Sequence, residues 1–104
     1  MAIQVDFKNP IGYYTTKWSG KSYKNEICPM NGLCAMIHTY DHPVHGTTIE
    51  LRGFFGDIEH AKKCIEKGYF SNCSGLTFYA KALTKDLWKM IQIMTKNGIK
   101  VTIK

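Results

Sequence analysis

Hydrophobic and polar residues alternate along several short stretches of the chain, and in two longer stretches the hydrophobic residues recur at helical spacing instead. Alternation indicates a strand with one covered face, whereas spacings of three and four indicate an amphipathic helix. The change between the two patterns is clearest in residues 47–68. There Ile49 and Leu51 alternate with Glu50 and Arg52, which predicts a half-buried strand that leads into a helix.

The predicted helix is bounded by residues suited to its two ends. Asp57 is placed to accept hydrogen bonds from the first free backbone N–H groups, and Gly68 can adopt the left-handed conformation that ends a helix. Between them, the hydrophobic residues fall on one helical face: Ile58, Ala61, Cys64 and Ile65. These features predict a helix between Asp57 and Gly68.

The first half of the chain carries the strand pattern throughout. Predicted strands lie at residues 2–7, 13–18, 22–27 and 33–40. The second and third form a hairpin around Ser19-Gly20-Lys21, because glycine is common in tight turns. Few charges interrupt residues 33–40, so we expect that strand to be central and covered on both sides. It should pair antiparallel with the strand that starts at Thr47.

The second half repeats the step from strand to helix. Residues 76–82 alternate, and Thr84 then offers a second N-cap, with Asp86 in the first turn where a negative charge suits the helix dipole. The hydrophobic face of this helix consists of Leu87, Met90, Ile91 and Met94. Asn97-Gly98 ends it, and residues 99–103 alternate as a final strand.

This order of elements predicts an α+β fold. N-terminal strands and hairpins are followed by a β-α-β-α-β arrangement, so we expect a mixed, mostly antiparallel sheet with two helices packed on one face. At 104 residues and 44% hydrophobic content, the chain fits a single α+β domain that spans residues 1–104.

Composition sets the expected compartment. No hydrophobic run approaches the roughly 20 residues that cross a bilayer, so we expect no membrane partner. Asp6 lies where a signal peptide would need its apolar centre, which favours a mature cytoplasmic protein. In that setting the four cysteines are expected to be free thiols.

The chain is basic, with a formal net charge of +6 from thirteen lysines and one arginine against eight acidic residues. Residues 47–104 carry +5 of this charge. Such an excess favours encounter with polyanions, whatever the fold. With a single arginine, specific reading of guanine is nearly excluded, so any nucleic-acid binding should have low sequence specificity.

The strongest functional pattern is the interleaving of aromatic and basic residues in the first hairpin. Aromatic rings can stack on bases while lysines neutralise phosphates. Tyr14 and Trp18 share one side of their strand, which predicts an aromatic face, unless that face packs into the core. The candidate binding residues of the hairpin are Tyr14, Lys17, Trp18, Lys21, Tyr23 and Lys24.

A second basic set lies on the predicted helices and the strand before them: Arg52, Lys62, Lys63, Lys85 and Lys89. Two helices on one side of the sheet would place the helix lysines on a common surface. That surface could meet a phosphate backbone or an acidic protein, or could simply be a solvated helix face.

Residues 28–45 contain the side chains that bind zinc most often: Cys28, Cys34, His38, His42 and His45. Structural zinc sites usually pair their ligands two to four residues apart, and the two cysteines here are separated by five. We therefore expect neither a metal nor another cofactor. The loop histidines also permit a small metal-independent ribonuclease, in which one of them moves a proton while lysines hold the phosphate.

Together these patterns predict a small, basic, non-enzymatic binding protein whose partner is RNA or single-stranded DNA. One alternative is an interaction or inhibitor module, of the kind found in phages and mobile elements, that docks on a larger protein, including one that itself binds nucleic acid. The ribonuclease is the second alternative. We identify no catalytic residues.

Overall fold

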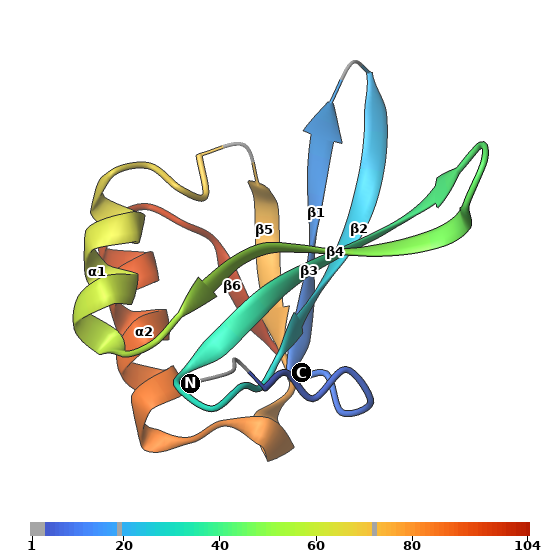
Figure 1. Ribbon diagram of the computed structural model, residues 1–104. Helices are drawn as coiled ribbons and strands as arrows, with labels where there is room; N and C mark the ends of the chain where they lie inside the picture. The colour runs from blue at the N-terminus through green and yellow to red at the C-terminus, as the bar shows by residue number, and fades with distance from the viewer. Residues whose placement is uncertain (1–3, 19, 72) are drawn as a thin grey trace.

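In the computed structural model, which describes residues 4–18, 20–71 and 73–104, a six-stranded mixed sheet carries both helices on one face (Figure 1). The strands are β1 (Gly12–Trp18), β2 (Lys21–Cys28), β3 (Cys34–His42), β4 (Gly46–Phe55), β5 (Cys73–Phe78) and β6 (Val101–Ile103), and the helices are α1 (Ile58–Glu66) and α2 (Lys85–Lys96). The sheet order is β4-β3-β2-β1-β5-β6. Among the described strands, only β5 and β6 pair parallel. The predicted α+β fold is therefore confirmed.

The two helices begin and end where the sequence predicts. The Asp57 carboxylate accepts a hydrogen bond from the His60 backbone N–H at 2.8 Å, and the Thr84 hydroxyl accepts one from Leu87 N–H at 3.2 Å. Each interaction satisfies a backbone donor that the first helical turn leaves free. Gly68 has a φ of +85°, in the left-handed region. No helix in the described ranges is long and apolar enough to cross a membrane.

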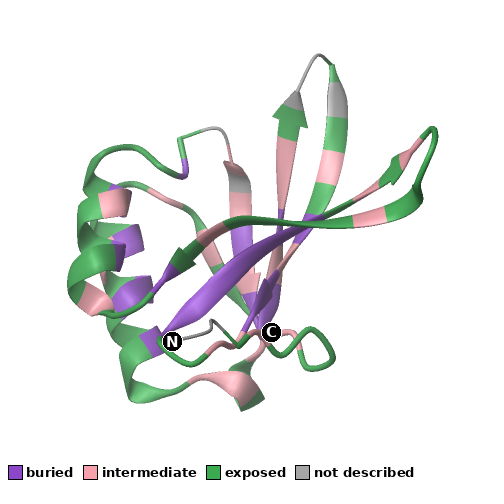
Figure 2. Cartoon of the chain, in the orientation of Figure 1, coloured by how far each residue is buried: buried purple, intermediate pink, exposed green. Residues whose placement is uncertain are grey.

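The main core lies between the helices and one face of the sheet. From the helices it contains Ala61, Ile65, Leu87, Met90, Ile91 and Met94, and from the strands chiefly Tyr14, Ile27, Met36, Phe55, Leu76 and Phe78. Figure 2 shows these buried segments between the helices and the adjacent strands. The prediction that both helices pack on one face is confirmed, and we call the opposite face of the sheet the open face.

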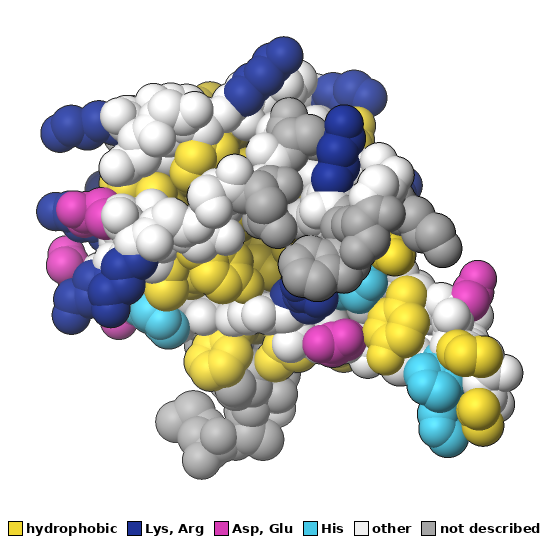
Figure 3. Space-filling view, turned by 90° about the horizontal axis from the view of Figure 1, so that it is seen from above, with side chains coloured by type: hydrophobic (Ala, Val, Ile, Leu, Met, Phe, Trp, Pro, Cys, Tyr) yellow, Lys and Arg dark blue, Asp and Glu magenta, His cyan; other side chains and the backbone are white. Residues whose placement is uncertain are grey.

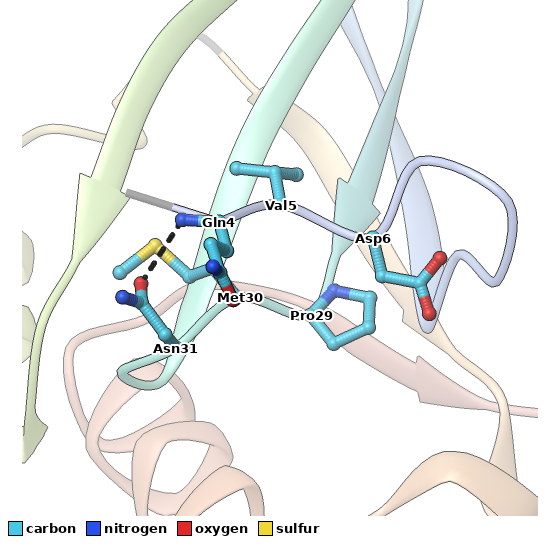
Figure 4. A pocket seen from close by; sticks show the side chains of 6 residues that line it. All are labelled: Gln4, Val5, Asp6, Pro29, Met30 and Asn31. Carbon is cyan, nitrogen blue, oxygen red and sulfur yellow. Dashed lines mark hydrogen bonds between the residues drawn. The ribbon is translucent and has the colours of Figure 1, made fainter. Parts of the chain in front are cut away.

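The N-terminal segment covers one corner of the open face. Val5 and Met30 pack against a small cluster of Cys28, Ala35 and Ile37 on that side. Figure 4 shows these two segments side by side, around a cavity of about 420 Å³. The predicted two-sided burial of β3 is thus right for its first five residues, Cys34–His38, whereas the second half of the strand is largely exposed.

The strand predicted at residues 2–7 is wrong for the described residues 4–7. Val5 forms only an isolated bridge with Met30. Pairing stops there because the Asp6 carboxylate turns the chain, accepting hydrogen bonds from Lys8 N–H at 3.1 Å and from the Asn9 amide at 2.9 Å. Asn31 also ties this segment down, since its side-chain oxygen accepts from Gln4 N–H at 3.3 Å (Figure 4).

Two further predictions need correction. Ile49 and Leu51 were expected on the covered side of a half-buried strand, but they are 57% and 43% exposed, because β4 is an edge strand and their side of it belongs to the open face. The strand predicted at residues 76–82 ends at Phe78. Ala80–Ala82 form a short 3-10 helix instead, in which Ala82 N–H donates to the Tyr79 carbonyl at 2.9 Å.

The β1–β2 and β3–β4 hairpins extend beyond the helices and diverge from each other (Figure 1). Figure 2 shows that exposed residues predominate along the β3–β4 extension and in the described part of the β1–β2 extension. Side chains on both faces of these extensions are therefore available to ligands.

Candidate nucleic-acid interface

Tyr13 lies in the interior of the sheet and faces the open side. On β1 it pairs with Glu26 of β2 and Thr77 of β5. Because successive side chains of a strand point to opposite faces, its neighbour Tyr14 enters the core while Tyr13 remains outside. Tyr13 is the aromatic residue of this strand that a ligand on the open face would meet.

Basic and aromatic groups surround the Tyr13 ring. The ammonium nitrogens of Lys24 and Lys104 lie 5.4 Å and 5.7 Å from the ring centroid, within the range of a cation–π contact. The Tyr79 ring centroid is 6.0 Å away. These four residues form what we call the Tyr13 cluster. It joins β1, β2 and the chain after β5 and β6.

Lys104 also donates a hydrogen bond to the Tyr13 hydroxyl, with an Nζ–Oη distance of 3.1 Å. This hydrogen bond lowers the pKa of Tyr13, and it raises the pKa of Lys104 in turn. The ammonium group of Lys104 therefore stays protonated to a higher pH than that of an ordinary lysine. A cation is held beside an aromatic ring at any physiological pH.

Further basic groups continue the Tyr13 cluster. Lys17 is exposed on the same side of β1, four residues after Tyr13. Beside Tyr79, Lys8 and Lys81 line a hollow of about 640 Å³, and none of the described residues that line it carries a carboxylate. Glu26, opposite Tyr13, is the acidic residue of β2 on the open face. The balance of charge around the cluster is positive.

The predicted hairpin residues whose side chains the structure describes lie on two different faces of the sheet. Lys17 and Lys24 lie on the open face. Tyr14 is only 5% exposed and packs edge-on to Phe70 in the main core, so the alternative that this face packs into the core holds for Tyr14, and its ring is not exposed for stacking. Tyr23 lies on the helix side, edge-on to His38. The side chains of Trp18 and Lys21 lie outside the described residues.

The other predicted basic residues form a different surface. Lys62, Lys63, Lys85 and Lys89 are exposed on the helices, and Arg52 lines a cavity on the helix side of the sheet. The sheet itself separates them from the Tyr13 cluster. The candidate residues therefore belong to two faces and do not form one continuous site.

The histidines form a column of rings with aromatic neighbours, from Tyr23 through His38 and Tyr40 to His42 and His45. Figure 3 shows histidine side chains grouped at one end of the molecule and others elsewhere on this face. His42 Nδ1 accepts hydrogen bonds from the backbone N–H groups of Val44 and His45, at 3.0 Å and 3.2 Å. Within the described ranges, no three His, Cys, Asp or Glu residues gather as metal ligands would.

His38 is held in one tautomer. The Asn25 amide nitrogen lies 3.2 Å from the Tyr23 carbonyl oxygen, which can only accept, so the amide oxygen faces His38 Nδ1 at 2.8 Å. Nδ1 must therefore carry the proton, and Nε2 has the lone pair. Burial, followed by the charge of Arg52, lowers the pKa of His38, so the ring is neutral near pH 7.

The cysteines are all free thiols, as predicted. Burial raises the pKa of Cys28 to about 11 and that of Cys34 to about 12. A thiol with so high a pKa is a poor nucleophile and a poor metal ligand at neutral pH. These two residues act as small apolar core residues.

Sequence reasoning missed Tyr13, Tyr79 and Lys104 as site residues. Alternation alone places Tyr13 and Lys17 on the same side of β1, so this signal was available. The contact between Tyr13 and Lys104 joins residues 91 positions apart, and it depends on where β6 is placed in the sheet. No local pattern contains that information.

Comparisons of the chain with models of known protein families, with curated proteins and with solved structures gave no match.

Proposed function

We propose that this protein binds single-stranded RNA or DNA on its open face, around the Tyr13 cluster, with low sequence specificity. The observation that carries the proposal is the position of two lysine ammonium groups within 6 Å of one aromatic ring. Tyr79 and Lys17 extend the same surface. Single-stranded nucleic acid offers both groups that such a surface attracts.

Aromatic rings and lysines would bind different parts of the nucleic acid. A base has an apolar face that can stack on an aromatic ring, and every base has one, so stacking tolerates any sequence. Lysines bind the phosphates as point charges and release counterions, which makes binding strongly dependent on salt. Double-stranded nucleic acid keeps its base faces hidden, so it should bind more weakly than a single strand.

The test compares two double variants with the same loss of charge. Lys24→Ala/Lys104→Ala removes the cations of the Tyr13 cluster, and Lys62→Ala/Lys63→Ala removes two cations from α1 on the other side of the sheet. Binding of a labelled single-stranded oligonucleotide is measured by fluorescence anisotropy at several salt concentrations. Each phosphate contact contributes about 0.7 to the slope of log affinity against log salt, so the first variant should lower the slope by about 1.4.

The α1 variant should keep the slope of the unsubstituted protein. Equal losses in both variants would mean that only net charge matters, and would contradict a site on the open face. Tyr13→Ala provides the second arm: loss of one stacked base should weaken binding about tenfold at any salt concentration. If the protein binds no oligonucleotide at low salt, the proposal fails.

One observation favours a second candidate, a protein-docking module. Ile49, Leu51 and Phe54 form an exposed apolar row on the open face of β4, where the sheet ends. Edge strands with apolar side chains can accept a strand from another protein. Such binding would resist salt and would weaken on Leu51→Ser, which removes an apolar contact without adding charge, whereas the nucleic-acid site would be unaffected by this substitution.

A further inference from the structure

A polar cavity lies on the helix side of the sheet, opposite the Tyr13 cluster. Its volume is about 200 Å³. Its polar lining comes from four parts of the chain and consists of Tyr14, Thr16, Asn25, Arg52, Tyr69 and Cys73. Figure 3, which looks onto the molecule from above, shows a hollow near the centre of the view. Hydrophobic side chains lie at its base, and basic and histidine side chains lie nearby. The open-face proposal does not use this cavity.

Arg52 lies at a bulge in β4. Gly53 pairs with Met36 and Leu51 with Ile37, so Arg52 is the extra residue between them. Alternation from Leu51 places Arg52 on the helix side, and the bulge lets the next residue, Gly53, face the same side. The bulge is held by Tyr69, whose hydroxyl donates to the Arg52 carbonyl at 3.0 Å.

Gly53 is required for this arrangement. A Cβ atom at Gly53 would collide with the Tyr69 hydroxyl. The glycine therefore leaves the space in which Tyr69 reaches the backbone of Arg52. Gly53 and Tyr69 together hold the Arg52 backbone in its bulged position.

Two hydroxyl groups are available as further donors. Asn25 donates its amide N–H to the Thr16 hydroxyl oxygen at 3.2 Å, which leaves the hydroxyl hydrogen of Thr16 free to donate. Tyr14 is 95% buried, yet its hydroxyl has no hydrogen-bond partner in the described part of the chain. No fully enclosed polar side-chain atom in the described ranges lacks a partner, so this hydroxyl keeps some exposure, and Tyr14 lines the cavity. A buried phenol that keeps an unused donor points to a ligand that accepts.

The charge of the cavity is positive. No carboxylate contributes to its lining, and within the described ranges Arg52 forms no ion pair. Burial raises the pKa of Tyr14 well above its ordinary range, and it raises the pKa of Cys73 to about 11, so neither group becomes an anion at neutral pH. His38, behind Asn25, is neutral there. Glu50 is the nearby acid on β4, and its charge acts on His38.

We propose that this cavity binds a phosphate group. An arginine without a protein partner prefers oxyanions, and its planar fork can donate two parallel hydrogen bonds to phosphate oxygens. The hydroxyls of Tyr14 and Thr16 supply the remaining donors from the floor of the cavity. The phosphate can be free or can belong to a nucleotide, since both present the same oxygens.

The test is a titration of the intact protein with inorganic phosphate, followed by isothermal calorimetry and by amide NMR shifts. Chloride at the same ionic strength is the reference. Saturable binding is expected, with shifted signals from Thr16, Asn25 and Arg52. Arg52→Gln should weaken binding at least tenfold, because a charge-assisted contact is lost. Lys62→Gln removes the same charge from α1 and should leave phosphate affinity unchanged.

Tyr14→Phe is the second variant, because it removes only the hydroxyl and keeps the ring in the core. Its affinity for phosphate should fall several-fold while circular dichroism and the melting temperature in chloride stay as in the unsubstituted protein. If phosphate binding does not saturate, or if both Arg52→Gln and Tyr14→Phe bind as the unsubstituted protein does, the proposal is overturned.

Adenosine monophosphate and adenosine separate the two sources of phosphate. Equal affinity for phosphate and for the monophosphate identifies a free-phosphate site, tighter binding of the monophosphate identifies a nucleotide site, and tighter binding of adenosine than of phosphate contradicts the proposal. Lys24→Ala/Lys104→Ala should not change phosphate affinity. Failure of this site and failure of the open-face site are therefore distinguishable.

Discussion

The two faces of the sheet use the same residue types for different purposes. Tyr14 and Phe55 are 5% and 1% exposed beneath the helices, while their chain neighbours Tyr13 and Phe54 lie on the open face, where Phe54 is 40% exposed. Adjacent residues of one type thus divide between core and surface. The position of the covering helices decides which member of each pair stabilises the fold and which is available to a partner.

The open face is itself divided between its two ends. Near β1 it carries lysines around an aromatic ring, and at β4 it carries Ile49, Leu51 and Phe54. The helix-covered face is uniformly apolar beneath the helices and becomes polar only where the hairpins extend past them. Function should therefore be sought where the helices leave the sheet uncovered.

The largest expected effect comes from the two phenylalanines at the end of β4. Phe55→Ala should lower the free energy of unfolding by about 3 to 5 kcal/mol, because it leaves a cavity in the main core. Phe54→Ala should cost about 1 kcal/mol or less, since much of its ring is already in water. Urea denaturation followed by circular dichroism measures both. Similar losses in the two variants would show that the open face is covered in solution.

A smaller effect is expected at α1, one of the two helices that cover the sheet. Asp57→Ala removes the N-cap of α1 and should lower the free energy of unfolding by about 1 kcal/mol. Asp86→Ala is the matched control, because it also removes a carboxylate from a first helical turn, but one that is not the N-cap. We expect a loss of about 0.3 kcal/mol from the control, in the range of a charge–dipole interaction. If Asp86→Ala lowered the free energy of unfolding as much as Asp57→Ala, the cap hydrogen bond would contribute nothing beyond a charge–dipole interaction.

The smallest effect should be a pH dependence of stability caused by His38, which lies where the hairpins extend past the helices. Burial lowers the pKa of His38 in the folded protein, whereas the unfolded chain has an ordinary histidine pKa near 6.5. The unfolded state therefore binds more protons below about pH 6.5, and stability falls as the pH falls toward the folded-state pKa. Melting temperatures between about pH 7 and pH 5 should fall less steeply for His38→Gln. Parallel curves for the two proteins would contradict the assignment.

Local patterns in the sequence predicted the helices and the hairpin correctly. Asp57 and Gly68 bound α1, and Thr84 precedes α2, because capping depends on neighbours in the chain. The parallel pairing at the C-terminal end was also predictable, since a helix-length connection permits it. These features need no knowledge of distant contacts.

The assignment of faces was not predictable in the same way. Alternation separates Tyr13 from Tyr14 and Ile49 from Glu50, but it does not say which side receives the helices. An edge strand such as β4 has no neighbour beyond it to extend the layer that would bury Ile49. The bulge at Arg52 is likewise invisible in the sequence, because it arises from pairing with β3.

Lys104, which follows β6, is held beside the candidate interface by its backbone as well as by its side chain. Its backbone N–H donates to the Phe78 carbonyl at 2.9 Å, and its carbonyl accepts from Ala80 N–H at 3.1 Å. Whatever is joined after Lys104, such as a purification tag or a fused protein, must leave the molecule beside the Tyr13 cluster. Binding assays should therefore carry their tags elsewhere, and a photoreactive label attached at this point would report directly on what the open face meets.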